Sequence, residues 1–158
     1  MKAMSRTSLA EYPCSIARTL DVIGDQWSFL IVRDALLGET TFSGFQRSLG
    51  VSKNILSQRL DNLVTNEIFR KAAVAEDARR YSYELTNKGK ELFPIVVAML
   101  QWGDKWMFGS EGEPVQVLDT KKRAPVQKVG VVSRDGRFLQ SQDVLYWPGA
   151  ASSKQPRR

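Results

Sequence analysis

The 158-residue sequence contains no histidine and a single cysteine, Cys14. The missing histidine excludes the Ser-His-Asp and Cys-His arrangements of nucleophilic catalysis, and one cysteine cannot form an internal disulfide or a cysteine-rich zinc site. No apolar run approaches the roughly 20 residues that a membrane helix needs, and residues 1–14 do not form a secretory signal. We therefore expect a soluble, cytoplasmic protein that is not an enzyme and has no cofactor or metal.

Charge is distributed unevenly along a chain of ordinary globular composition. Hydrophobic residues make up 42% and charged residues 25% of the sequence, and the formal net charge is +6. Residues 42–90 hold 9 basic and 5 acidic groups, whereas residues 1–41 and 91–110 each carry a net charge of −1. A basic centre between near-neutral apolar segments indicates contact with a polyanion. The alternative is that the modest excess only keeps the protein soluble.

Apolar residues at helical spacing predict four helices in the first part of the chain. Glycines end the first three of them, at Gly24, Gly38 and Gly50. Ser52 offers a hydroxyl cap for the fourth. The predicted helices span residues 15–23, 26–37, 42–49 and 52–66, with Phe42, Phe45, Leu49, Ile55, Leu56, Leu60 and Leu63 facing inward.

A hairpin and a final helix are predicted next. The period changes from 3.6 towards 2, which predicts strands at residues 68–75 and 80–85 around a turn at 76–79. Thr86 is placed to cap a long helix from Asn87 to about Met107, kinked by Pro94. This helix is apolar nearly all round, so we expect a second subunit to cover part of it.

The composition changes at Gly109–Pro114, and a small β-rich extension is predicted beyond it. Its strands are expected at residues 115–118, 126–132 and 137–146, and Asp135-Gly136 is a hairpin turn signal. The fold class is therefore mainly α with a β-hairpin (α+β). The predicted parts are an N-terminal arm (1–13), the main domain (14–108), the extension (109–151) and a flexible basic tail (152–158).

Two short helices joined at Gly50–Val51 and followed by a hairpin are the parts of a winged helix-turn-helix. The major groove of DNA admits one α-helix, and a preceding helix holds that reading helix outward. With Leu56, Leu60 and Leu63 buried, the outward side chains can bind base edges or phosphates; these are Ser52, Lys53, Asn54, Ser57 and Gln58, with Arg59 on the flank. The alternative is an ordinary solvated helix face.

Further DNA contacts are predicted outside this helix. Arg79 and Arg80 at the hairpin tip can reach the minor groove or flanking phosphates. Their acidic neighbours Glu76 and Asp77 support the alternative of a self-neutralised surface turn. Candidate backbone contacts around the third helix are Thr41, Ser43 and Arg47.

Residues from Pro13 to about Trp106 resemble the HxlR family of winged-helix transcriptional regulators. The matching segments are residues 14–24, 26–33, 41–45, 51–60 and 83–89. The resemblance implies a homodimer built from the first and last helices that binds operator DNA. It places the reading positions on Ser52–Arg59 and the wing on Glu76–Arg80. The sequence departs from the family pattern at Gln26, Glu67, Asp77 and Ala78, and its tail lacks the paired cysteines of longer members, which favours a metal-free, dimer-supporting extension.

A thiol and a set of aromatic residues are candidate effector positions. Cys14 stands at the start of the first helix, where the helix dipole and Arg18 favour a reactive thiolate. The resemblance implies that such a cysteine can sense oxidants or quinones; the alternative is a silent thiol at the dimer interface. Aromatic residues that could line an effector pocket, or could simply form core, are Trp27, Phe29, Phe93, Trp102 and Trp106.

Together these features predict a homodimeric regulator, a repressor, that binds double-stranded operator DNA through residues 52–65. The competing hypothesis is a winged helix that binds another protein through the same face. Because phosphate contacts release counterions, DNA binding should weaken steeply with salt, whereas a hydrophobic interface should not.

Overall fold

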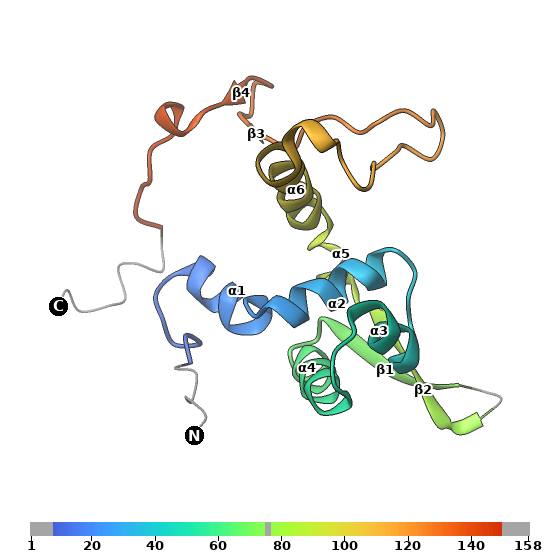
Figure 1. Cartoon of the computed structure of the whole chain (residues 1–158). Helices are drawn as coiled ribbons and strands as arrows, with labels where there is room; N and C mark the ends of the chain where they lie inside the picture. The colour runs from blue at the N-terminus through green and yellow to red at the C-terminus, as the bar shows by residue number, and fades with distance from the viewer. Residues whose placement is uncertain (1–7, 75–76, 150–158) are drawn as a thin grey trace. The chain divides into compact units, whose positions relative to one another are not determined.

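The computed structural model describes residues 8–74 and 77–149. They divide into two compact units, Met1–Phe93 and Pro94–Arg158. This division falls ahead of the boundary predicted at residue 108, and the functional grouping of residues 14–108 stays a prediction. The first unit contains α1 (Ser15–Ile23), α2 (Gln26–Leu36), α3 (Phe42–Leu49), α4 (Lys53–Thr65), β1 (Phe69–Val74), β2 (Asp77–Leu85) and α5 (Asn87–Lys90) (Figure 1).

Side-chain caps and a glycine set the helix boundaries of the first unit. The Ser52 hydroxyl accepts a hydrogen bond from the Ile55 amide at the start of α4. The Thr86 hydroxyl does the same for Gly89 in α5. Gly50, with a φ of 63°, ends α3 in the left-handed region, which favours glycine. These local signals confirm the predicted starts and stops.

The core of the first unit lies where α2, α3, α4 and β1 converge. Phe45 of α3 and Phe69 of β1 meet edge to face, with ring centroids 6.2 Å apart. Leu56, Leu60 and Leu63 of α4 are fully buried, at 0% exposure. The prediction for Ile55 was wrong, because its side chain is 37% exposed. The buried positions repeat at i, i+4 and i+7, so the residue before Leu56 is rotated about 100° away from the core.

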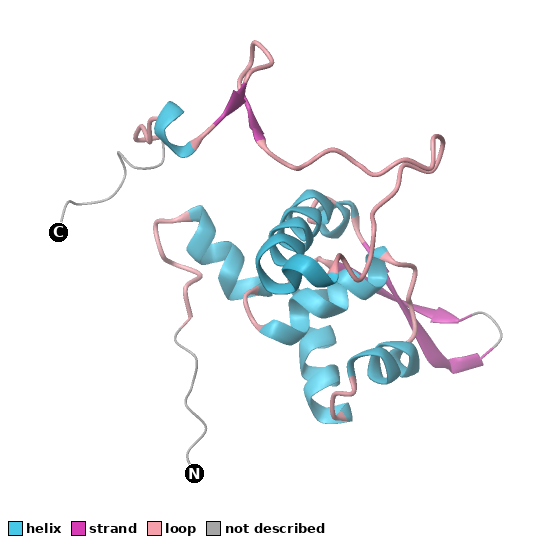
Figure 2. Cartoon of the chain, turned by 45° about the horizontal axis from the view of Figure 1, so that its top comes forward, coloured by secondary structure: helices cyan, strands magenta, loops and turns pink. Residues whose placement is uncertain are grey.

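The β-hairpin projects from the helices of the first unit (Figure 2). β1 and β2 are antiparallel, with Phe69 opposite Leu85 and Lys71 opposite Tyr83. The register shifts between Ala73 and Val74, and β2 begins at Asp77 rather than at the predicted Arg80. Mainly helical content with this hairpin confirms the α+β class and the winged helix-turn-helix arrangement.

The second unit is built on the apolar helix. It contains α6 (Phe93–Gly103), a π-helical turn η1 (Asp104–Phe108), η2 (Gly109–Glu111), β3 (Val131–Val132), β4 (Phe138–Leu139) and η3 (Ser141–Asp143). The prediction of one continuous helix from Asn87 was wrong. Pro94 has no amide hydrogen to donate and its ring clashes with the carbonyl four residues earlier, so α5 ends at Lys90 and α6 begins afresh.

The predicted β-rich extension is reduced to a minimal hairpin. Its turn is as predicted, because the Gly136 amide donates to the Ser133 carbonyl at 3.0 Å and Gly136 has a φ of 88°. The strands β3 and β4 have only two residues each. The strands predicted at residues 115–118, 126–132 and 137–146 were all wrong in extent, since an isolated two-stranded hairpin stays short. Within the described residues, no helix has the length and hydropathy that crossing a bilayer requires.

Candidate nucleic-acid interface

The solvent-facing side of α4 is mainly polar, with Ile55 as the one exposed large apolar residue in this helix. Its buried leucines hold the helix against the first unit, and Val51 anchors the preceding turn in the core. The predicted reading residues Ser52, Lys53, Asn54, Ser57 and Gln58 are all exposed. A donor and acceptor set of short and medium side chains on one helix side is suited to base edges in a major groove.

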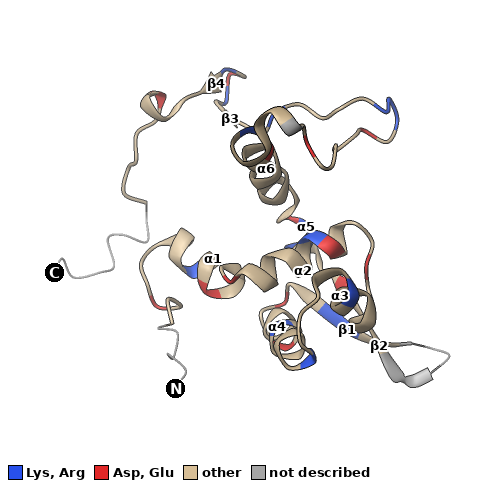
Figure 3. Cartoon of the chain, viewed as in Figure 1, with Lys and Arg blue, Asp and Glu red and all other residues tan. Residues whose placement is uncertain are grey.

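Positive charge lies beside this surface on neighbouring elements of the first unit. Figure 3 shows Lys and Arg on α3, α4 and β1. Ser43 and Arg47 on α3, the predicted contacts to the DNA backbone, are exposed, and their contact with DNA stays a prediction. Asp61 of α4 is the acidic exception, and it accepts a long hydrogen bond of 3.5 Å from Ser57. The exposed surface of α4 and its neighbours therefore contains both basic and acidic side chains, with the basic ones in excess.

Arg59 has a different position from the other predicted contacts. Its Nε lies 3.0 Å from Oδ1 of Asp25, and its side chain is half-buried. The same Asp25 oxygen accepts hydrogen bonds from the amides of Trp27 and Ser28 at the start of α2. Arg59 thus links α4 to the N-terminus of α2, a contact between distant positions that no local pattern indicates.

Thr41 caps α3 within a network centred on Glu39. The Glu39 carboxylate accepts hydrogen bonds from the amides of Thr40 and Thr41 and from the Thr41 hydroxyl. That hydroxyl in turn accepts from the Gly44 amide at 3.0 Å. A Cβ at Gly44 would collide with the Glu39 carboxylate, so a larger residue there would displace this carboxylate from its hydrogen bonds. The hydroxyl predicted to contact DNA is therefore already engaged in positioning α3.

These hydrogen bonds lower the pKa of Glu39 from its ordinary value of 4.5. The Thr41 amide is the main cause, and burial opposes it. When folding lowers the pKa of an acid, the ionised group stabilises the fold at every pH above its pKa in the unfolded chain. This stabilisation is lost as the pH falls through its pKa in the folded state.

We expect Glu39→Gln to lower the free energy of unfolding by about 1 kcal/mol at neutral pH. The difference from the native chain should shrink as the pH falls below about 4.5, where the carboxylate of the unfolded chain takes up a proton, and should disappear once the pH falls through the lower pKa of the folded state. Urea denaturation across this pH range measures both effects. Glu91→Gln, an exposed glutamate of the same unit, is the matched control, and a deficit that persists unchanged at acidic pH would contradict the assignment.

The stem of the hairpin contributes a basic residue that the sequence analysis missed. The ammonium group of Lys71 lies 4.3 Å from the ring centroid of Tyr81 and 5.7 Å from that of Tyr83. Arg70 beside it is paired with Glu84. The register of the hairpin creates this cation–π arrangement, because it places Lys71 directly opposite Tyr83 and next to Tyr81 on the diagonal. The side chains of Arg79 and Arg80 lie outside the described residues.

The candidate effector residues do not form one described site. Cys14 is exposed, and as the N-cap of α1 its thiol makes no capping hydrogen bond. Arg18 donates from Nε to the Tyr12 carbonyl at 2.8 Å, which holds the chain before α1. Trp27 is half-buried in the first unit, whereas Trp102 and Trp106 are exposed in the second. Their role in effector binding stays a prediction.

Comparison with known proteins identifies the family. The model of the HxlR-like helix-turn-helix family matches residues 22–111, which include α2 to α6 and both strands of the wing. The chain belongs to the HxlR-like helix-turn-helix family. It has the helix-turn-helix fold of that family, and the curated relatives it matches are described as HTH-type transcriptional regulators, of whose own length the chain spans about two thirds at 65%.

Individual proteins similar to this HxlR-like chain agree with the family assignment. It is 36% identical over 103 residues to the HTH-type transcriptional regulator Rv3095 of Mycobacterium tuberculosis, an alignment that covers 65% of each chain. It is similar to the crystal structure of PA1607, a candidate transcription factor, with a TM-score of 0.85 and 40% identity over 90% of this chain and 100% of that one. The reduced redox regulator HypR aligns with a TM-score of 0.56 and 27% identity over 62% of this chain and 98% of its own.

Proposed function

We propose that this protein is a homodimeric, sequence-specific repressor that inserts α4 into the major groove of operator DNA. The observation that carries the proposal is the division of α4 into two sides. Leu56, Leu60 and Leu63 are fully buried, whereas every predicted reading residue except Arg59 is exposed. A helix anchored this firmly by one side presents the other without rearrangement.

The chemistry of the exposed side chains assigns their roles. Asn54 and Gln58 offer the amide pair that recognises adenine, and Lys53 suits guanine or phosphate. Lys71 on the hairpin stem adds a phosphate contact, with Arg79 and Arg80 reaching the flanking groove. Repression follows when the bound dimer occludes the promoter.

Two exposed apolar surfaces support dimerisation. On α1, Ile16 is 71% exposed and Tyr12 lies exposed just before the helix. On α6 and the turn after it, four exposed side chains repeat at helical spacing: Ile95, Met99, Trp102 and Trp106. Exposed apolar stripes of this length are typical of protein interfaces, and a second copy of the chain would cover both.

Ile16→Glu combined with Met99→Glu is expected to convert the dimer to a monomer, because both charges would be buried in the interface. Sedimentation velocity at micromolar concentration measures the mass directly. Leu37→Glu is the control, since Leu37 is 73% exposed and lies outside both surfaces. A native protein that sediments as a monomer would refute the homodimer.

Selection of bound DNA from a random duplex pool tests the proposed function. We expect an inverted-repeat site whose half-sites lie about 34 Å apart, one helical turn, because each α4 of the dimer reads one half-site. Affinity for the selected site should fall steeply as salt rises. Recovery of no preferred sequence, together with salt-insensitive binding to another protein, would favour the protein-interaction winged helix instead.

The proposal also includes an effector: thiol-reactive compounds that modify Cys14 and thereby change operator binding. Cys14 is exposed, it precedes a helix of the proposed interface, and the neighbour HypR is described as a redox regulator. With one thiol per chain, the available products are an adduct, a mixed disulfide or an intersubunit Cys14–Cys14′ disulfide. Repeating the operator titration with diamide on the native chain and on Cys14→Ser tests it; equal loss of binding in both would exclude the thiol.

A further inference from the structure

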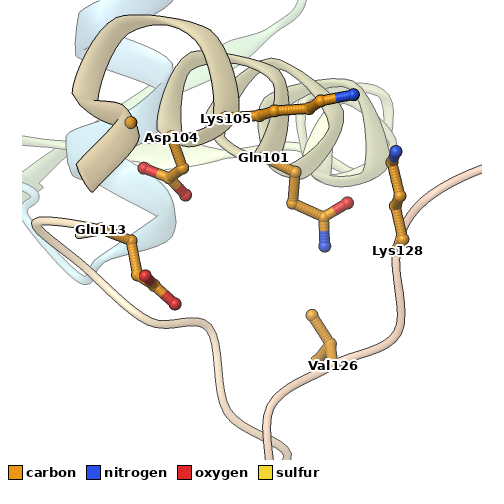
Figure 4. A pocket seen from close by; sticks show the side chains of 7 residues that line it. Gln101, Asp104, Lys105, Glu113, Val126 and Lys128 are labelled. Carbon is orange, nitrogen blue, oxygen red and sulfur yellow. The ribbon is translucent and has the colours of Figure 1, made fainter. Parts of the chain in front are cut away.

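The second unit contains an open polar cavity between α6 with η1 and the segment that follows. Its volume is about 460 Å³, within the range of small-molecule sites. Figure 4 shows Gln101 directed into this space, Asp104 and Glu113 at one edge of it, and Lys105 and Lys128 at the other. The lining residues are Gln101, Asp104, Lys105, Gly109, Glu113, Val126 and Lys128.

One side chain attaches the segment after η2 to α6. Gln101 donates from Nε2 to the Gln127 carbonyl at 3.1 Å, and its Oε1 accepts from the Val129 amide at 2.8 Å. The backbone at residues 127–129 is therefore joined to α6 through the Gln101 side chain, which spans the distance between them. Immediately after this clamp the helix changes to the π-helical turn η1, a rare conformation that often occurs at functional sites.

Opposite charges lie on separate sides of the polar cavity. Asp104 and Glu113 lie on one side, and Lys105 and Lys128 on the other (Figure 4). Among the described residues, no ion pair joins the two sides. The backbone amide of Glu113 and the Gln116 side chain lower the pKa of Glu113, so its carboxylate is ionised at neutral pH. The ammonium of Lys105 lies 4.4 Å from the Trp106 ring centroid, which leaves Lys128 as the principal cation.

A smaller apolar cavity adjoins the acidic side. It has a volume of about 100 Å³ and shares Gln101, Asp104, Glu113 and Val126 with the polar cavity, but neither lysine lines it. Its other walls include Leu100, Val115, Val117 and Pro125. The polar cavity and this smaller cavity together form what we call the combined site. Along it lie, in order, an apolar space, two carboxylates, the Gln101 amide and a lysine ammonium.

We propose that this combined site binds a small zwitterion with an aliphatic side chain, an α-amino acid of the size of leucine. The aliphatic side chain occupies the apolar cavity, the ammonium group lies between Asp104 and Glu113, and the carboxylate faces Lys128. Each charged group of the ligand pairs with protein side chains of opposite charge that form no ion pair with one another across the cavity, and burial of the aliphatic side chain adds apolar stabilisation. The site uses no residue of the DNA-binding surface.

Calorimetric titration of the full chain with L-leucine, in the absence of DNA, tests the proposal. We expect saturable binding at millimolar or lower concentration. Two probes divide the recognition: leucinamide lacks the carboxylate and 4-methylpentanoate lacks the ammonium group, and each should bind about tenfold more weakly.

Conservative variants assign the charges to residues. Asp104→Asn with Glu113→Gln should abolish the preference for leucine over 4-methylpentanoate, and Lys128→Gln should abolish the preference over leucinamide. Lys121→Gln removes an exposed lysine of the same unit that does not line the cavity and should bind like the native chain. Absence of leucine binding up to about 10 mM, or variants that bind all three probes like the native chain, would overturn the proposal. Neither outcome depends on operator binding, which the proposed function tests separately.

Discussion

Replacement of Lys53 and Asn54 together by alanine is expected to lower operator affinity at least about 30-fold and to leave the free energy of unfolding within about 0.5 kcal/mol. Both side chains are exposed in the first turn of α4, where a reading helix meets base edges. Alanine is the best helix former, so the helix itself should persist. Affinity is measured by gel-shift titration with the selected operator, and stability by urea denaturation.

The two single variants should fail in different ways. Lys53→Ala should weaken binding to all sequences and make the dependence on salt less steep, because one phosphate contact per subunit is lost. Asn54→Ala should mainly relax the base preference at one position of each half-site. Lys90→Ala removes an exposed lysine of α5 and serves as the charge-matched control. A double variant that binds like Lys90→Ala would exclude α4 as the reading helix.

Arg59→Ala is informative beside these variants because Arg59 is paired with Asp25. Its loss releases the carboxylate that caps α2, so its effect on DNA binding should be accompanied by a loss of stability. Since its side chain is partly exposed, that loss should not exceed about 1 kcal/mol. Affinity and stability measured together thus separate a positioning residue from a direct contact.

Phe45→Ala is expected to destabilise the protein by about 3–5 kcal/mol. Phe45 is fully buried, and its ring meets that of Phe69 at an interplanar angle of 87°. Its removal leaves a cavity between the helix that supports α4 and the first strand of the hairpin. The surrounding helices are fixed by caps and cannot collapse fully into that space. The variant therefore loses the transfer free energy of the buried ring, and the remaining cavity destabilises it further.

Thermal unfolding followed by circular dichroism measures this effect. The midpoint should fall by at least about 12 °C, given about 4 °C or more for each kcal/mol in a domain of this size. Phe138→Ala is the matched control, because Phe138 in β4 is 62% exposed and its truncation should change stability by less than about 0.5 kcal/mol. Equal midpoints for the two variants would contradict the position assigned to the core.

Much of the fold follows from signals carried by short stretches of the sequence. Ser52, Thr86 and Gly50 act on backbone groups within a few residues of themselves, and Pro94 interrupts a helix through its own missing amide hydrogen. The repeat of Leu56, Leu60 and Leu63 likewise predicted the buried side of α4, and with it the polar side that faces solvent. Ile55 was assigned wrongly because it lies at the edge of the apolar stripe of α4. Whether such a residue faces the core or the solvent depends on how the helix is rotated about its axis, and packing alone sets that rotation.

The sequence by itself determined the helices of the first unit, the hairpin that follows them and the polar side of α4, because caps, breakers and periodicity act over one or two turns. Only the tertiary structure decided that Arg59 is paired with Asp25, that Lys71 lies over Tyr81 and that Gln101 is hydrogen-bonded to the Gln127 carbonyl. Those contacts join residues 10 to 34 positions apart in the chain. Their partners are selected by the arrangement of whole elements in space, which no local pattern of residue types encodes.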